Sequence, residues 1–188
     1  MRESMVMPIT ADIETRRPAV GTPAISGRWM VDPQASHAGF VAGTLAGLVK
    51  TQGRFGSLSG DLVVDEAHAT GALVIDSSSI DTGNRMRDRH LRSRAFFDVK
   101  RHPHLRYEAQ WISGREPGRA RIEGELIVAD IRTPLPLDVG LRTPADGVLE
   151  FACRTEVDRV ALGIRGARGM VPRAVQLDLA ITLRQAIT

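Results

Sequence analysis

The sequence predicts an all-β protein that folds as a single antiparallel β-barrel of about eight strands with a short helical insert. Three observations lead to this prediction. Apolar and polar residues alternate with period two along most of the chain, which is typical of strands with one buried face. Eight or more such segments follow one another, and a sheet that wide with one apolar face tends to close on itself. The length of 188 residues is that of one domain.

The first 27 residues carry no such alternation and predict a flexible N-terminal tail, so the barrel domain is expected at 28–188. The tail contains no apolar core of a secretory signal, and no later stretch has the roughly 18 consecutive apolar residues of a transmembrane helix. The lone Cys153 excludes an intramolecular disulfide. We therefore expect a cytoplasmic protein without a transmembrane segment.

The first half of the domain holds strands that end at Gly, Asp and Ser-rich turns. The alternation is clear where Leu58, Leu62 and Val64 share one face and Asp61 and Asp65 share the other. We expect strands near residues 28–33, 36–44, 49–56, 58–65 and 70–76.

The segment 84–97 departs from period two and predicts a helical insert between strands. Asn84 is a suitable N-cap, Asp88 and Arg92 have the i, i+4 spacing of a helical pair, and no Gly or Pro occurs until Pro103.

The second half returns to alternation, with the most regular pattern near the C-terminus. Pro136 interrupts one segment and predicts an edge or a bulge there, because proline cannot donate to a sheet ladder. We expect strands near residues 105–111, 121–128, 135–139, 149–154 and 175–184.

The interior of an eight-stranded barrel is either filled by side chains or holds one slender ligand. Ordinary core packing and ligand contact are both open for each inward residue, because both require an apolar side chain. The inward candidates are Phe40, Leu45, Leu48, Val49, Phe55, Leu62, Leu73, Ile75, Leu91, Phe96, Phe97, Leu105, Tyr107, Trp111, Leu126, Leu137, Phe151 and Leu177.

A set of short motifs occurs in a fixed order along the domain. The longest lies in the helical insert and reads Arg87-Asp88-Arg-His90-Leu91-Arg-Ser93-Arg-Ala-Phe96-Phe97-Asp98-Val99. The others are Trp29-Met-Val-Asp32-Pro33 with Ser36, Gly53-Arg-Phe55 with Leu58 and Gly60, Ser79-Ile-Asp81-Thr82-Gly-Asn84, Gly124-Glu-Leu126, Thr133-Pro134-Leu-Pro-Leu137 and Arg159-Val-Ala-Leu-Gly163.

On these motifs the chain resembles the YceI-like polyisoprenoid-binding family over essentially all of 28–188. The resemblance implies an extended, lipocalin-like barrel with an apolar tunnel occupied by an isoprenoid chain, and frequent dimerisation. It implies binding, storage or transport of a long isoprenoid lipid, either a polyprenyl chain or a quinone tail, with no other cofactor. Transient contact with a membrane stays open.

The insert carries five arginines, and Arg87, which the longest motif includes, is our candidate for contact with a phosphate or quinone head group. The alternative is a solvated helix face whose arginines pair with Asp81, Asp88 and Asp98. Binding of nucleic acid or of an anionic surface through this insert is disfavoured because the net charge is only +3 and aromatics are 4% of residues.

The sequence shows no established catalytic or metal-binding pattern. The five histidines match no metal-ligand spacing, and no nucleophile elbow or phosphate loop occurs. We expect a binding protein and not an enzyme. The alternative is an enzyme that acts on a small apolar substrate in the same cavity, with Arg87, Asp88 and His90 near its mouth.

Overall fold

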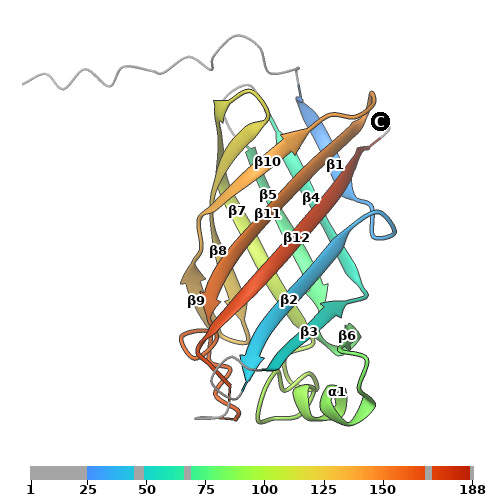
Figure 1. Ribbon diagram of the computed structural model, residues 1–188. Coiled ribbons are helices and arrows are strands. Elements are labelled where there is room, and N and C mark those ends of the chain that lie inside the picture. Colours follow the sequence, from blue (N-terminus) through green and yellow to red (C-terminus); the bar gives the residue numbers. More distant parts are fainter. Residues whose placement is uncertain (1–24, 45–48, 66–68, 168–170, 187–188) are drawn as a thin grey trace, which may run out of the picture.

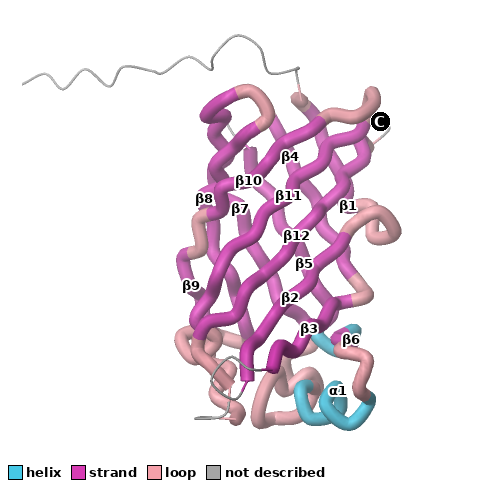
Figure 2. Tube along the Cα trace, viewed as in Figure 1, coloured by secondary structure: helices cyan, strands magenta, loops and turns pink. Residues whose placement is uncertain are grey.

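The computed structural model describes residues 25–44, 49–65, 69–167 and 171–186. The expected flexible tail, residues 1–27, lies outside these ranges except for its last three residues. Within the described ranges the chain is built almost entirely from antiparallel strands (Figure 2). The strands are β1 (Gly27–Val31), β2 (His37–Thr44), β3 (Val49–Phe55), β4 (Leu58–Val64), β5 (Ala69–Asp76), β6 (Ile80–Asp81), β7 (His104–Glu116), β8 (Arg119–Val128), β9 (Ile131–Pro134), β10 (Leu137–Arg142), β11 (Val148–Asp158) and β12 (Ala174–Gln185).

Eight of these strands close into a barrel, which confirms the predicted fold class (Figure 1). The order around the barrel is β1-β4-β5-β7-β8-β10-β11-β12, and β1 joins the two ends because it pairs with both β4 and β12. Met30, for example, lies opposite Asp61 on one side and Arg184 on the other. This closure removes the exposed sheet edges that an open sheet would present.

Strand β12 pairs with two different strands along the edge that does not face β11. Its N-terminal part pairs with β2, so that Leu177 lies opposite Phe40, while its C-terminal part pairs with β1. Strands β3 and β6 continue from β2 and extend the barrel wall toward the end where the helix lies (Figure 1). The sheet therefore continues through β2, β3 and β6 beyond the eight strands that close the barrel.

Strand β7 contains a β-bulge that interrupts the expected alternation. Ala109 lies opposite Gly124, but the next paired residues are Trp111 with Glu123 and Ile112 with Ile122. The extra residue changes the phase of the strand, so the regular alternation that we expected to run through Trp111 ends at Ala109.

The only helix longer than one turn among the described residues is α1 (Arg85–Leu91). As predicted, Asn84 caps it, since its side-chain oxygen accepts hydrogen bonds of 3.1 Å from the backbone N–H groups of Met86 and Arg87. The helix is shorter than the expected 84–97 because the chain turns after Leu91 and brings Phe97 back to it, where the Phe97 N–H bonds the Leu91 carbonyl at 3.1 Å. No helix in the described part of the chain is long and apolar enough to span a membrane.

The interior holds two hydrophobic clusters. The first, remote from α1, contains Trp29, Leu62, Leu149 and Leu183 among its buried residues. The second lies at the α1 end, where Leu91 and Phe97 pack against buried residues such as Phe55. Pro136 separates β9 from β10, and both of these strands pair with β8, so the proline breaks a strand in two.

Candidate ligand-binding cavity

Residues of the first cluster line an apolar cavity of about 90 Å³. Side chains from both sides of the barrel line it, with Leu62 and Leu73 on β4 and β5 and Phe151 on β11. Strand β12 alone contributes Leu179, Ile181 and Leu183, which occupy alternate positions and face the same side of the sheet. Such a space contacts hydrocarbon on almost every side.

Small residues on the inner wall help to keep this space open. Gly71 on β5 and Ala109 on β7 are direct strand partners and both line the cavity. A Cβ atom added at Gly71 would lie 2.4 Å from the carbonyl oxygen of Asp61, which is closer than such atoms approach in proteins, so the backbone there tolerates only glycine. Gly124 on β8 is the strand partner of Ala109, and there the Tyr107 ring occupies the space that a side chain would take.

Two polar side chains at the cavity, those of Tyr107 and Cys153, are hydrogen-bonded or protonated. The Tyr107 hydroxyl donates a 3.0 Å hydrogen bond to the carbonyl of Leu135, and burial raises its pKa well above the usual value, with a smaller effect from Cys153. Burial also raises the pKa of the Cys153 thiol to about 11, and the charge of Asp178 adds to the shift. At neutral pH both side chains are uncharged, which suits an apolar ligand.

The second cluster fills the barrel between this cavity and α1. Phe55 contacts Phe40 and Phe97, with ring centroids 5.9 Å apart in each pair. Leu162, from the loop after β11, is buried beside them. None of these residues lines the cavity, so the second cluster and the cavity occupy different parts of the barrel interior.

The inward candidates from the sequence separate into these two regions. The cavity is lined by Leu62, Leu73, Tyr107, Leu137 and Phe151. The second cluster contains Phe40, Phe55, Ile75, Leu91, Phe97, Leu105 and Leu126.

The remaining candidates have other positions. Phe96 packs edge to face on His90, with ring centroids 5.0 Å apart, and Leu177 is half-buried on β12. Leu45 and Leu48 lie outside the described residues, and so do the side chains of Val49 and Trp111.

Sequence reasoning missed several cavity residues that a strict count by two would have found. Val139 follows Leu137 at the next inward position, and Leu179, Ile181 and Leu183 continue the series of Leu177. Ile112 could not be found in this way, because the bulge in β7 moves it into the inward phase. The observation that places Ile112 on the inner face is its pairing with Ile122, and this pairing is known only from the strand register of β7 and β8.

Arg87 does not reach the cavity. Its Nε and one terminal nitrogen each donate 2.8 Å hydrogen bonds to Thr82, to the hydroxyl and the carbonyl respectively. Asp88 is buried and accepts from the backbone N–H and the hydroxyl of the same threonine, at 3.0 and 2.5 Å. Arg87 and Asp88 therefore attach α1 to Thr82, and neither they nor the exposed His90 line the cavity, where the enzyme alternative requires them.

The expected pairing of the insert's arginines with Asp81, Asp88 and Asp98 is also not what the structure shows. Asp81 pairs with Arg54 at 3.6 Å, and Asp88 is bonded to Thr82. Arg92 instead donates to the carbonyl oxygens of Ser78 and Ile80, at 2.8 and 2.6 Å. Arg92 thus ties the segment after α1 to the short η2 turn (Ser77–Ser79) and the start of β6.

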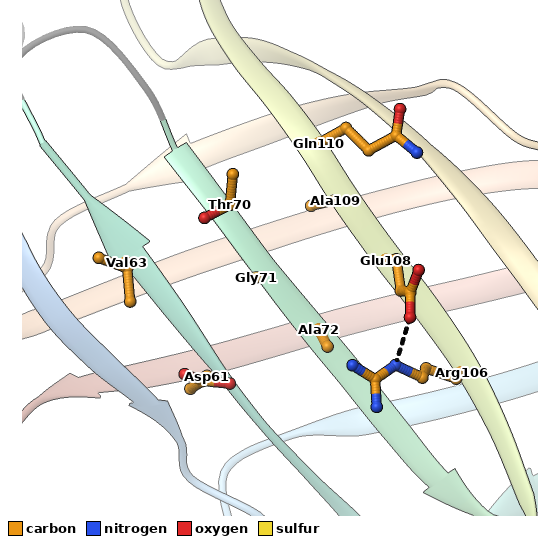
Figure 3. Close-up of a pocket in the computed structure, with 9 residues that line it drawn as sticks. All are labelled: Asp61, Val63, Thr70, Gly71, Ala72, Arg106, Glu108, Ala109 and Gln110. Carbon is orange, nitrogen blue, oxygen red and sulfur yellow. Dashed lines mark ion pairs between the residues drawn. The ribbon is translucent and has the colours of Figure 1, made fainter.

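A larger, open groove of about 420 Å³ lies on the outside of the barrel across β4, β5 and β7 (Figure 3). Charged side chains in the groove form ion pairs, because Arg106 pairs with Glu108 at 2.8 Å and Arg132 pairs with the same carboxylate at 3.0 Å. The groove thus presents paired surface charges, and the interior cavity is the better candidate for an apolar ligand.

Comparison with known proteins agrees with this architecture. The model of the YceI-like domain family matches residues 29–183. The chain belongs to the YceI-like family. Two solved structures share the fold: BcnA from Burkholderia cenocepacia, with a TM-score of 0.73 and 19% identity over 81% of this chain and 98% of that one, and a polyisoprenoid-binding domain from Saccharophagus degradans, with a TM-score of 0.72 and 14% identity over 84% and 98%.

Related sequences also occur among the UPF0312 proteins. A UPF0312 protein from Shewanella baltica is 25% identical over 174 residues, which cover 84% of this chain and 87% of that protein. A Vibrio parahaemolyticus member is 25% identical over 115 residues, or 58% of this chain. The match spans only 60% of the length of the Vibrio relative.

Proposed function

We propose that this YceI-like protein binds an isoprenoid lipid, either a polyprenyl chain or the tail of a quinone, inside its barrel and acts as a carrier or store without catalysis. The unfilled apolar space inside a closed barrel is the observation that carries this proposal. The phenol of Tyr107 and the thiol of Cys153 line this space, and neither is charged at neutral pH. The Saccharophagus domain of the same fold is described as polyisoprenoid-binding, which supports the same ligand class here.

The size of the cavity determines how such a ligand enters. About 90 Å³ is below the roughly 300–1,000 Å³ of pockets that enclose a drug-sized ligand. A long chain therefore places only its end in this space and displaces side chains of the second cluster, above all Phe55 and Phe97, along the barrel axis. Each buried methylene contributes about 0.8 kcal/mol, so a dozen methylene equivalents supply on the order of 10 kcal/mol before the costs of association.

The test is to purify the protein without detergent, extract it with organic solvent and identify bound lipids by mass spectrometry against a blank purification. We expect one polyprenyl or quinone species in a near-stoichiometric amount. The extracted protein is then titrated with prenols of increasing length, and we expect affinity to rise with length until the barrel is filled.

Two results contradict the proposal. A clean extract together with no binding of any added prenol shows that the barrel interior is only a core. A stoichiometric fatty acid in the extract, with prenols unable to displace it, assigns the cavity to a different lipid class.

A further inference from the structure

The charge of this protein is concentrated in one segment. Residues 82–104, which contain α1 and the turns that follow it, hold seven Arg and Lys residues and two Asp residues. Their net charge is +5 with histidines neutral, whereas the whole chain carries +3. The rest of the protein is therefore slightly acidic, and the small total charge conceals this basic segment. Figure 1 shows that its helix α1 lies at one end of the barrel.

Three arginines within residues 85–94 remain available to a partner. Arg85, Arg89 and Arg94 are exposed, and no ion pair joins any of them to an acid in the part of the chain that the structure describes. Arg87 and Arg92, by contrast, are bonded to Thr82 and to backbone carbonyls. The barrel wall differs as well, since Arg121, Arg132 and Arg154 all pair with carboxylates there.

An exposed apolar residue lies among these cations. Met86 is 81% exposed, more than any other large hydrophobic residue that the structure describes. Because residues three and four apart share a helix face, Met86 lies beside Arg89 and His90. Exposure of a methionine is unfavourable in water and has no packing role here, while a flexible thioether inserts readily into an apolar environment.

We propose that the α1 end of the barrel docks on the surface of an anionic lipid bilayer, with Arg85, Arg89 and Arg94 against lipid phosphates and Met86 in the interfacial layer. Clustered arginines with an apolar residue on one helix face are the features that bind peripheral proteins to anionic leaflets. Nucleic acid offers the same phosphates, but aromatics are only 4% of the chain, so stacking surfaces for bases are scarce.

This inference goes beyond the proposed function and does not depend on it. It has a consequence for the cavity, however, because Leu91 and Phe97 of the same segment pack in the second cluster that fills this end. Docking there places the filled end of the barrel, and not the end near Trp29, against the bilayer.

The experiment is co-sedimentation of the full chain with vesicles of phosphatidylcholine alone and with about 30% phosphatidylglycerol, at low salt and at 0.5 M NaCl. We expect binding to the anionic vesicles only, lost at high salt because exposed charges are screened. Reversal of two charges, R85E/R89E, is expected to lower the partition coefficient about tenfold or more, and Met86→Asp about threefold.

The matched control reverses two exposed arginines at the opposite end, R119E/R142E. Each has an acidic strand partner, Glu116 and Glu150, so we expect vesicle binding within about twofold of the wild type. If both double variants lose vesicle binding to the same extent, net charge alone explains the binding, and the proposal is overturned. Absence of vesicle binding overturns it too, as does a tight complex with single-stranded RNA that vesicles do not displace. Prenol titration of the same variants distinguishes a docking failure from a failure of ligand binding.

Discussion

The hydroxyl of Tyr107 donates a 3.0 Å hydrogen bond to the carbonyl oxygen of Leu135, so the single tyrosine of the chain presents its ring to the cavity while its polar atom is engaged in the wall. This geometry makes Tyr107 a wall residue and not a polar anchor for a ligand. It also ties β7 to the segment between β9 and β10, across the break at Pro136.

Tyr107→Phe is expected to lower the free energy of unfolding by about 1 kcal/mol, because the Leu135 carbonyl loses its hydrogen-bond partner. Prenol affinity should stay unchanged, since the ring remains. Urea denaturation and prenol titration measure the two effects. A loss of affinity without a loss of stability contradicts the assignment and makes the hydroxyl a ligand contact.

Cys153 provides a reporter inside the cavity, because it is the only cysteine and one of the lining residues. Its pKa near 11 leaves little thiolate at neutral pH, so alkylation of the native protein should be slow and should accelerate as the pH approaches 11. A bound prenol should slow it further at every pH. Iodoacetamide labelling followed by mass spectrometry checks this, with unfolded protein as the control for intrinsic reactivity. Labelling that a saturating prenol does not change places the ligand elsewhere.

The same shift predicts how stability depends on pH. The thiol keeps its proton in the folded protein up to about 11, whereas in the unfolded chain it ionises at its ordinary value of 9.0. The folded state thus binds more protons between these values, and the free energy of unfolding should fall as the pH rises from 9 toward 11. Cys153→Ala should flatten this part of the curve. Tyr107, whose pKa is also raised, adds a further decline above pH 10, which Tyr107→Phe should remove.

Arg159 organises the loop that follows β11 and closes the α1 end. It is 5% exposed, and its guanidinium donates to the carbonyls of Pro172, Ile164, Gly166 and Val171 at 2.7–2.9 Å. Arg159→Met is expected to lower the free energy of unfolding by about 2–4 kcal/mol, because these carbonyls lose a buried donor.

The control for this loop is Arg173→Gln, which removes only the exposed pair with Asp158 and should cost less than about 1 kcal/mol. Limited proteolysis should cut the Arg159 variant within the loop and leave the Arg173 variant intact. Equal stability of the two variants refutes the organising role of Arg159.

Filling the cavity should block ligand binding without unfolding the barrel. Ala109→Leu places a larger side chain among the lining residues, and we expect prenol affinity to fall about tenfold or more, at a stability cost of roughly 1–3 kcal/mol from overpacking. Ala180→Leu is the matched control, since Ala180 is exposed on β12. Unchanged prenol affinity in the Ala109 variant means that the ligand does not use this cavity.

The predictable part of the fold is local. Alternation placed Leu62, Leu73, Leu137 and Phe151 on inward faces, and the structure brings all four to one cavity. A strand with one buried face must alternate, so its inner residues can be read without knowing its neighbours. The N-cap at Asn84 was predictable for the same reason, since the cap and the N–H groups that it binds lie within three residues.

The position of the empty space was not predictable in this way. Phe55 and Leu62 both belong to inward faces, yet Phe55 packs against Phe97 in a filled cluster while Leu62 borders the cavity. Whether an inward residue meets a side chain or a void depends on the residues across the barrel. Glycines at positions such as 71 decide it, and so does the bulge in β7.

The all-β class, the inward faces of the strands and the capped start of the helix follow from the sequence, because each depends on periodicity or on contacts within a few residues. The closure of β1 on β12, the partners of Arg87 and Arg92, and the exposure of the cations beside Met86 follow only from the three-dimensional arrangement. The closure joins residues far apart in the chain, as with Met30 and Arg184. Such pairings depend on which surfaces meet when the sheet closes, and no local pattern specifies that.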